Sequence, residues 1–462
     1  MTYENKEKIS NKSCWIKTKP IGLILFIFIF IFNNNVFAYN NLDYEKAYFK
    51  NLNIKEDCIT GTPIKLNNRN LLFIGEVYNH ILDTETYEIK NLKQQIENVY
   101  VYSPVLLNNS EILFVGTYTT PPSDKFQQEI YDTIFRNQYN ARRKIKEYKQ
   151  LSEDEREKFY LPYFKNNNNF LKNYQEYKQK YEESMYSILY NPKTNKYKKV
   201  GKINERRHKP KTLLLNNGNV LVWGGSILGN NSIEVYNPSI EKYIQIKGKN
   251  WNNNTKAILM NDGRVFISNG EIYNPKDNTF TKLSEMNWQD SILLDNGNIY
   301  DYSTGKIYNS KTNSITNIKM LKNNCYIKIP ENRILYCKVP SDINIYDIEQ
   351  QKTININNLA SIRSCYMSNM LLLNNNEVLI YNGEVSKYNK EYGTLKSILY
   401  AEGIRVQNKL QLLNLETGKI KIMKNKAPNY LMTNPVLLND GKIIFHINGN
   451  NKYIILIPKI LD

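Results

Sequence analysis

The stretch that decides the fold is TLLLNNGNVLVWGG, which begins at Thr212. It consists of an aliphatic triplet, a turn of Asn and Gly, and a second apolar run. Asn-Gly between two apolar runs is a strong short-range signal for a β-hairpin. A third strand is expected at 233–236 and, after a turn at Asn237-Pro238, a fourth at 243–246. The segment therefore predicts a sheet of four short antiparallel strands.

The same phrase recurs eight times along the chain. Close copies begin at Ala257, Ser291, Met370 and Pro435, and looser copies begin at Pro63, Pro104 and Cys325. A unit of this length cannot bury both faces of its own sheet, so neighbouring units must stack around an axis. Repeated four-stranded units are typical of a β-propeller. The sequence predicts one all-β ring of eight blades, with seven as the alternative if one looser copy is irregular.

The two ends of the chain complement each other. In the last unit three strands are expected, at 435–438, 442–446 and 453–458, and the sequence then ends without a fourth. A strand-like stretch at 48–54, ahead of the first repeat, would complete this blade and remove the exposed edges of an open array. We expect residues 39–462 to form one propeller that closes between its N- and C-terminal strands.

Several segments resemble kelch repeats. The stretches LYNPKTNKYKKV from Leu189 and IYNPKDNTFTKL from Ile272 look like the kelch phrase of an apolar strand, Tyr-Asp-Pro, a turn and an aromatic strand. The join ERRHKPKTLLLNNGNVLVWGG from Glu205 is similar to a join between two such units, as in the central domain of galactose oxidase. The resemblance covers most of residues 61–458 in pattern and implies a propeller of kelch-like blades.

The first 38 residues form a separate unit. Five lysines precede an apolar run from Ile21 to Phe32, and Val36-Phe37-Ala38 supplies small residues at the positions that a signal peptidase reads. The run is too short to span about 30 Å of hydrocarbon. We expect residues 1–38 to be a cleaved signal peptide that leaves no stable membrane span, and the mature protein to be periplasmic, on the cell surface or secreted.

The chain is basic, with a net charge of +18, and loss of the signal with its five Lys and two Glu leaves +15. Strong basicity can mark a protein that binds nucleic acid. Here the lysines are dispersed along a chain that also uses Asn, Ile and Tyr heavily, and no nucleic-acid-binding motif accompanies them. We therefore expect no nucleic-acid partner.

Four cysteines follow the predicted signal: Cys58, Cys325, Cys337 and Cys365. Export permits disulfides, and four cysteines allow three connectivities. Cys325 and Cys337 lie on the two arms of one expected hairpin. A two-residue turn would put them on opposite faces of the sheet, whereas a three-residue turn would bring them together. A Cys325–Cys337 disulfide thus depends on the length of that turn.

Two long segments interrupt the repeat, at 119–185 and at about 384–408. The first carries helix signals, with Ser123 as a cap followed by apolar and aromatic residues at helical spacing. We therefore expect a helical insertion within the second blade. Both segments fall between the second and third strands of their blades, so they open on the same face as the joins between blades. Function in repeat folds concentrates on such a loop face.

The joins on that face carry the candidate ligand-binding residues, Arg207, His208, Trp251, Trp288 and Arg363. Exposed Trp rings can stack on a sugar, and Arg can pair with an anionic group, so these residues would suit a glycan or protein partner. The alternative is that Arg and aromatic residues at the joins pack neighbouring blades together. An exposed ring would serve binding, and a buried ring would serve packing.

Catalysis has little support in the sequence. The histidines His80, His208 and His446 form no metal-ligand pattern with Cys, and no nucleophile elbow or phosphate loop is present. We expect no metal and no cofactor. The leading hypothesis is an exported binding or interaction module for a glycan or protein partner. The alternatives are a carbohydrate-active enzyme, such as a sugar mutarotase or epimerase, and a structural component of the envelope.

Overall fold

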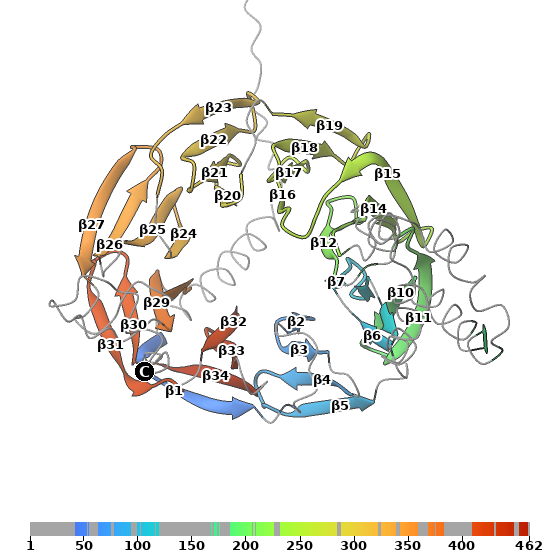
Figure 1. Ribbon diagram of the computed structural model, residues 1–462. Coiled ribbons are helices and arrows are strands. Elements are labelled where there is room, and N and C mark those ends of the chain that lie inside the picture. Colours follow the sequence, from blue (N-terminus) through green and yellow to red (C-terminus); the bar gives the residue numbers. More distant parts are fainter. Residues whose placement is uncertain are drawn as a thin grey trace, which may run out of the picture.

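The computed structural model is a closed ring of four-stranded antiparallel sheets (Figure 1). Eight such sheets surround one axis, so the prediction of an eight-bladed β-propeller is confirmed. The structure describes residues 42–52, 54, 63–74, 78–93, 99–101, 103–115, 117–119, 168, 171–172, 175, 185–205, 207, 209–225, 232–283, 288–321, 325–338, 342–358, 368–374, 376–382, 409–428, 431–447 and 452–460.

The blades are numbered along the chain, and their strands are given from the innermost to the outermost. Blade 1 is β2 (Ile64–Lys65), β3 (Asn70–Phe73), β4 (Tyr78–Asp83) and β5 (Ile89–Lys93), and blade 2 is β7 (Pro104–Leu106), β8 (Ile112–Phe114), β10 (Tyr186–Asn191) and β11 (Lys196–Lys202). Blade 3 is β12 (Lys211–Leu214), β13 (Val220–Trp223), β14 (Ser232–Asn237) and β15 (Lys242–Asn250), and blade 4 is β16 (Ala257–Leu259), β17 (Val265–Ile267), β18 (Glu271–Asn274) and β19 (Thr279–Lys282). Blade 5 is β20 (Ser291–Leu293), β21 (Ile299–Asp301), β22 (Lys306–Asn309) and β23 (Ser314–Asn317), and blade 6 is β24 (Cys325–Ile329), β25 (Arg333–Lys338), β26 (Asp342–Asp347) and β27 (Lys352–Asn358). Blade 7 is β28 (Ser368–Leu372), β29 (Glu377–Asn382), β30 (Lys409–Asn414) and β31 (Ile420–Lys426), and blade 8 is β32 (Met432–Leu437), β33 (Ile443–Ile447), β34 (Lys452–Ile460) and β1 (Leu42–Leu52).

The inner hairpin of each blade closes with a loop of three residues. In blade 3, Leu214 pairs with Val220, and the amide of Leu215 donates to the carbonyl of Asn219 over 2.8 Å, so the loop is 216–218. Gly218 ends this loop with φ +84°, in the left-handed region where a side chain is strained. The repeated Asn and Gly therefore supply the backbone conformation that the hairpin requires.

The loop glycines also make room for the neighbouring blade. A Cβ added at Gly263 in blade 4 would lie 3.2 Å from Nδ2 of Asn216, which opens the loop of blade 3. In blade 6, where the loop contains no glycine, Asn332 accepts a hydrogen bond from the amide of Asp295 in blade 5 over 2.7 Å. Loops of adjacent blades are thus in contact on one face of the ring.

The outer hairpins explain the recurring Tyr-Asn phrase. The hydroxyl of Tyr273 donates to Oδ1 of Asn278 over 2.7 Å, and that of Tyr308 donates to Asn313 over 2.6 Å. Both asparagines have positive φ, near +58° and +54°. Asn tolerates this conformation better than most residues. Tyr and Asn at this spacing therefore fix the turn between the third and fourth strands.

Apolar side chains fill the space between neighbouring sheets. Between blades 3 and 4, Leu221 and Val235 pack with Val265 and Tyr273 in one cluster. The second strands have neighbours on both faces, and β13 is buried at all of its positions. Strands that are covered on both faces read as continuous apolar runs, which is why the second arm of each hairpin lacks polar alternation.

β1 closes the ring as the outermost strand of blade 8. It pairs antiparallel with β34 and places Phe49 opposite Leu456. The buried hydroxyl of Tyr44 donates to the carbonyl of Gly441 over 2.6 Å, and the carbonyl of Ala47 accepts from Asn425 of blade 7 over 2.8 Å. The sequence placed this strand at 48–54. It begins earlier because Tyr44 and Ala47 belong to the core.

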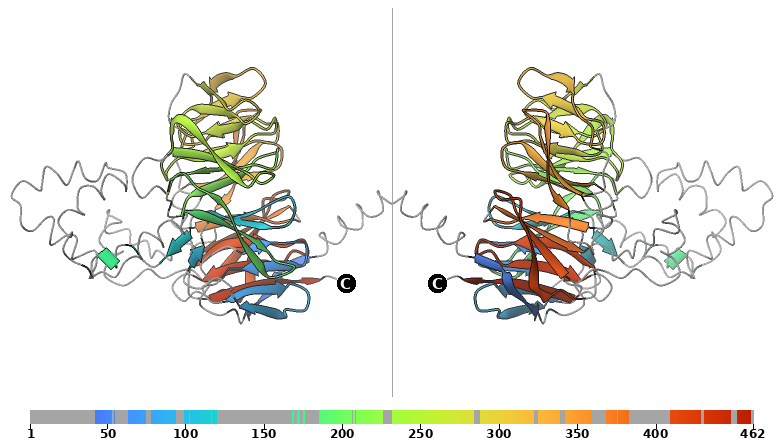
Figure 2. Two further views of the ribbon diagram at one scale, coloured as in Figure 1. Left: turned by 90° about the vertical axis from the view of Figure 1, so that its right-hand side faces the viewer. Right: turned by 90° about the vertical axis from the view of Figure 1, so that its left-hand side faces the viewer.

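Seen edge-on, the ring is a disc, and the small sheet of β6 (Val99–Val101) and β9 (Thr117–Thr119) lies at one of its faces (Figure 2). β6 precedes the innermost strand of blade 2, and β9 follows the second strand of that blade. The predicted signal at 1–38 and most of the predicted helical insertion at 119–185 lie outside the described residues. Among the residues that the structure describes, no helix has the length and apolar character needed to cross a membrane.

Tyr44→Ala should destabilise the protein far more than Tyr48→Ala, because Tyr44 is 1% exposed and Tyr48 on the same strand is 52% exposed. Truncating a buried aromatic residue costs about 3–5 kcal/mol, whereas an exposed one changes the free energy of unfolding by about 0.5 kcal/mol. Urea unfolding of the two variants measures this difference. Equal, small losses would show that β1 is not needed to close the ring.

Candidate functional site

The two tryptophans predicted at the joins are buried between blades. Trp251 is 1% exposed, and its ring meets Trp223 and Phe280 edge-on at centroid distances of 6.0 Å. Trp288 is fully buried and contacts Phe266 edge-on at 5.2 Å. Of the two interpretations that the sequence left open for these rings, their burial favours packing between blades. They fill the gap that each join would otherwise leave between neighbouring sheets.

Trp251 also borders a partly buried ion pair. Lys249 and Glu271 form this pair, and the carboxylate also accepts a hydrogen bond from Asn269 over 2.9 Å and from the Trp251 indole over 3.5 Å. Burial raises the pKa of Glu271, but the hydrogen bonds from Lys249 and Asn269 outweigh it and hold the pKa below its ordinary value. The join into blade 4 is thus fixed by both aromatic and ionic contacts.

Arg207 is buried in a network of charges inside blade 3. Its guanidinium donates to Glu234 over 2.9 Å, to the carbonyl of Gly224 over 2.8 Å and to the carbonyl of Ser232 over 2.8 Å. Glu205 lies 3.5 Å from the same guanidinium and accepts from the amide of Ser232. The network connects the join that precedes blade 3 to the second and third strands of that blade. Arg207 therefore has a structural role.

His208 and Arg363 lie outside the described residues. Of the five predicted positions, the structure therefore places Arg207, Trp251 and Trp288, and it places each of them inside or between blades rather than on a common exposed surface. Binding by this face of the ring stays a prediction.

Cys325 and Cys337 stand directly opposite each other, because the loop of blade 6 has three residues. Nevertheless Cys325 is a free, buried thiol, and burial raises its pKa to about 12. Cys337 is disulfide-bonded, and not to Cys325. The Cys325–Cys337 disulfide that the sequence allowed is therefore not formed, since Cys337 already has another partner.

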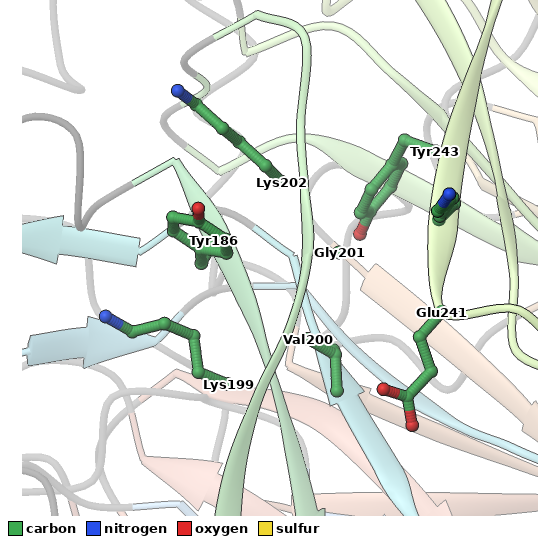
Figure 3. Close-up of a pocket in the computed structure, with 8 residues that line it drawn as sticks. Tyr186, Lys199, Val200, Gly201, Lys202, Glu241 and Tyr243 are labelled. Atoms are coloured by element: carbon green, nitrogen blue, oxygen red, sulfur yellow. The ribbon is translucent and has the colours of Figure 1, made fainter.

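An open groove of about 540 Å³ lies on the rim between blades 2 and 3. Its lining comes from the start of β10, the second half of β11, Glu241 in the turn before β15, and the start of β15. Figure 3 shows Tyr186, Lys199 and Lys202 on one side of β11, and Glu241 and Tyr243 on the other. The groove therefore brings together cationic, aromatic and carboxylate side chains from two blades.

A β-bulge at Gly201 arranges these side chains. Tyr186 pairs with Lys202 whereas Ser187 pairs with Val200, so Gly201 is an extra residue in β11. In a regular strand Lys199 and Lys202 would point to opposite faces, because side chains alternate. The extra residue puts both lysines on the face of Tyr186. Figure 3 shows the two lysine side chains projecting to the same side with Tyr186 between them.

Glycine is required at the bulge because β11 approaches blade 3 closely there. A Cβ added at Gly201 would lie 2.9 Å from the carbonyl oxygen of Glu241 and 3.1 Å from the ring of Tyr243. The hydroxyls of Tyr243 and Ser187 are hydrogen-bonded over 2.6 Å, which fixes Tyr243 against β10. The wall of the groove nearest blade 3 is therefore rigid.

The charge of the groove is predominantly positive, with three lysines and one carboxylate in its lining. The ammonium group of Lys199 lies 5.2 Å from the centre of the Tyr186 ring. Glu241 pairs with Lys198 across the two blades, but both side chains are exposed, and such pairs contribute about 0–1 kcal/mol. Within the described part of the chain, Lys199 and Lys242 take part in no ion pair. Two cations are thus available to a ligand.

The groove was not predicted, because lysines are dispersed along the whole sequence. The signal that could have found it is Gly201 inside KYKKVGK, since an isolated glycine in a strand pattern indicates a bulge. Among the described residues, no group of His, Cys, Asp and Glu side chains has the arrangement of a metal site.

Arg207→Met should lower the free energy of unfolding by about 3–5 kcal/mol, because Glu205 and Glu234 would stay buried without their cation. Adding Glu234→Gln should recover part of the loss, since it removes one uncompensated charge. Arg69→Met is the control, with an exposed ion pair worth about 0–1 kcal/mol. Thermal and urea unfolding check the series. A double variant no more stable than Arg207→Met would contradict the proposed charge network.

Gly201→Ala should destabilise the protein by about 1–3 kcal/mol, because the new methyl group meets a backbone oxygen that cannot move freely. Urea unfolding measures the loss. Unchanged stability would show that the bulge relaxes and that β11 is not held against blade 3.

No family model and no curated protein matches the sequence. Among solved structures, the chain is similar to a fungal alcohol oxidase of the AA5 family in complex with copper, with 12% identity, a TM-score of 0.41, and 90% of this chain and 77% of that chain covered. It is similar to virginiamycin B lyase from Staphylococcus aureus, with 9% identity, a TM-score of 0.40 and coverage of 89% and 99%. It is also similar to the C-terminal WD40 domain of Sif2, with 11% identity, a TM-score of 0.45 and coverage of 90% and 99%.

Proposed function

We propose that this protein is an exported binding module that holds an anionic glycan or protein partner in the groove between blades 2 and 3. The observation that carries the proposal is the bulge at Gly201, which puts Lys199 and Lys202 on either side of Tyr186. Ammonium groups pair with carboxylate, sulfate or phosphate groups, and a Tyr side chain offers both a ring face and a hydroxyl donor.

The shape of the groove favours binding over catalysis. It is open along the rim and its charged side chains reach toward solvent. A carbohydrate-active enzyme of the mutarotase type would need polar groups that converge in a closed pocket from which water is excluded. An open basic groove instead suits a partner that binds across it and is released without a chemical change.

We also propose that the blades are kelch-like. The phrases from Leu189 and Ile272, which resemble kelch repeats, fall on the third and fourth strands of blades 2 and 4. There Tyr190 and Tyr273 hydrogen-bond the turn asparagines, so the residues that carry the resemblance have one shared structural role. Export rests on the signal-like sequence at 1–38 alone.

The test is a calorimetric titration of the purified mature chain with three polyanions: polygalacturonate, a heparin oligosaccharide and poly-L-glutamate. We expect at least one to bind, more weakly at higher ionic strength because salt screens exposed charges. Lys199→Glu with Lys202→Glu should weaken binding by about tenfold or more, which is ~1.4 kcal/mol. The control is Lys282→Glu with Lys352→Glu, which changes two exposed lysines on the outer strands of blades 4 and 6.

The control should bind as tightly as the unmodified chain, although it carries the same type of charge change. Absence of binding to all three polyanions would refute the proposal. Equal losses in the control and the groove variant would also refute it, since the attraction would then come from net charge rather than from the groove.

A further inference from the structure

We infer that the ligand of this groove is an acidic glycan rather than an acidic polypeptide, an inference that rests on the function proposed above. An acidic sugar unit carries its anionic group and several hydroxyl donors on one ring. The groove has the complementary pattern, with Lys199 and Lys202 beside Tyr186 and the carboxylate of Glu241 across β11 (Figure 3).

Glu241 is the residue that separates the two kinds of ligand. Its carboxylate accepts hydrogen bonds only, so it can hold sugar hydroxyl groups. A deprotonated aspartate or glutamate side chain offers this carboxylate no donor and is repelled by it, whereas an acidic sugar unit brings hydroxyl donors beside its anionic group. The present partner of Glu241, Lys198, is 62% exposed, and an ion pair that is this open to water leaves the carboxylate able to exchange partners.

The backbone of β11 also disfavours a polypeptide. Peptides commonly bind to an exposed sheet edge by adding a strand, which needs a regular ladder of amide and carbonyl groups. The bulge between the pairs Tyr186–Lys202 and Ser187–Val200 interrupts that regularity at the groove. Recognition at this point must therefore come from side chains, as it does for a glycan.

Each side chain then has a defined part. Lys199 and Lys202 pair with the carboxylate or sulfate of the sugar, and the partly exposed Tyr186 supplies its ring face and hydroxyl group between them. Glu241 accepts hydroxyl groups of the same or the next unit. The volume of about 540 Å³ lies within the range of about 300–1,000 Å³ for small-ligand sites, so the groove holds a short stretch of the chain.

The decisive experiment is Glu241→Gln, titrated with polygalacturonate, a heparin oligosaccharide and poly-L-glutamate. Glycan affinity should fall by about tenfold, because the sugar hydroxyl groups would then donate to a neutral amide oxygen instead of a carboxylate. Affinity for poly-L-glutamate should rise, because a repulsive charge is removed. The matched control is Glu331→Gln in blade 6, another exposed glutamate paired with a cation, and it should change neither affinity.

Further titrations show which anionic group is bound, and they separate a failure of the glycan inference from a failure of the proposed function. Polygalacturonate supplies carboxylates, heparin supplies sulfates, and neutral dextran should not bind. Tyr186→Ala should weaken glycan binding more than Tyr186→Phe. If poly-L-glutamate binds as tightly as the glycans and Glu241→Gln moves all affinities in one direction, the glycan inference is overturned while the anionic groove stands. If no polyanion binds, the proposed function fails as well.

Discussion

The architecture depends on the antiparallel pairing of β1 with β34, because every other blade relies on neighbours that only a closed ring provides. A blade buries each face of its sheet against the next blade, so an open array would leave two apolar faces and two strand edges in water. The pairing of Phe49 with Leu456 and the burial of Tyr44 remove both. Residues almost 400 positions apart in the chain thereby share one sheet, as the hydrogen bond from Tyr44 to Gly441 illustrates.

Polar contacts between adjacent blades reinforce this closure on both faces of the ring. On one face the Asn that opens a hairpin loop reaches the next loop, as Asn216 does at Gly263. On the other, Lys211 donates to the carbonyl of Thr255 over 3.2 Å, and Lys256 donates to the carbonyl of Gln289. Lysines at the joins therefore bind the backbone of the next join. The rim lysines of blade 2 differ, because their ammonium groups reach outward from the outermost strand.

The sequence was sufficient for the features that repeat. A recurring turn of Asn, Asp or Gly between two apolar runs predicted eight blades. The three-residue loop that blade 6 shares with the other blades explains why Cys325 and Cys337 are opposite each other. The solvent exposure of the tryptophans at the joins could not be predicted from the sequence. The local pattern around a Trp before an inner strand is the same whether its ring faces solvent or the next blade. Trp251 is buried only because Phe280 and Trp223 converge on it from two different blades. Such contacts depend on how far adjacent sheets rotate, which local pattern does not encode.

The candidate site was not predicted for a related reason. It depends on a β-bulge in β11, which changes which side chains point to each face of that strand. Register shifts occur in the outer strand pairs of blades 2, 3, 6, 7 and 8, so the irregularity recurs around the ring. Its outcome depends on the residues that flank it. In blade 6 the extra residue is Ile356, which packs against the core between blades 6 and 7. In blade 2 the extra residue is Gly201, which has no side chain to bury and lets β11 approach blade 3, while the lysines on either side turn to one face. The same type of bulge that adds a core side chain in blade 6 therefore presents lysines on one face of β11 in blade 2, where a ligand can reach them.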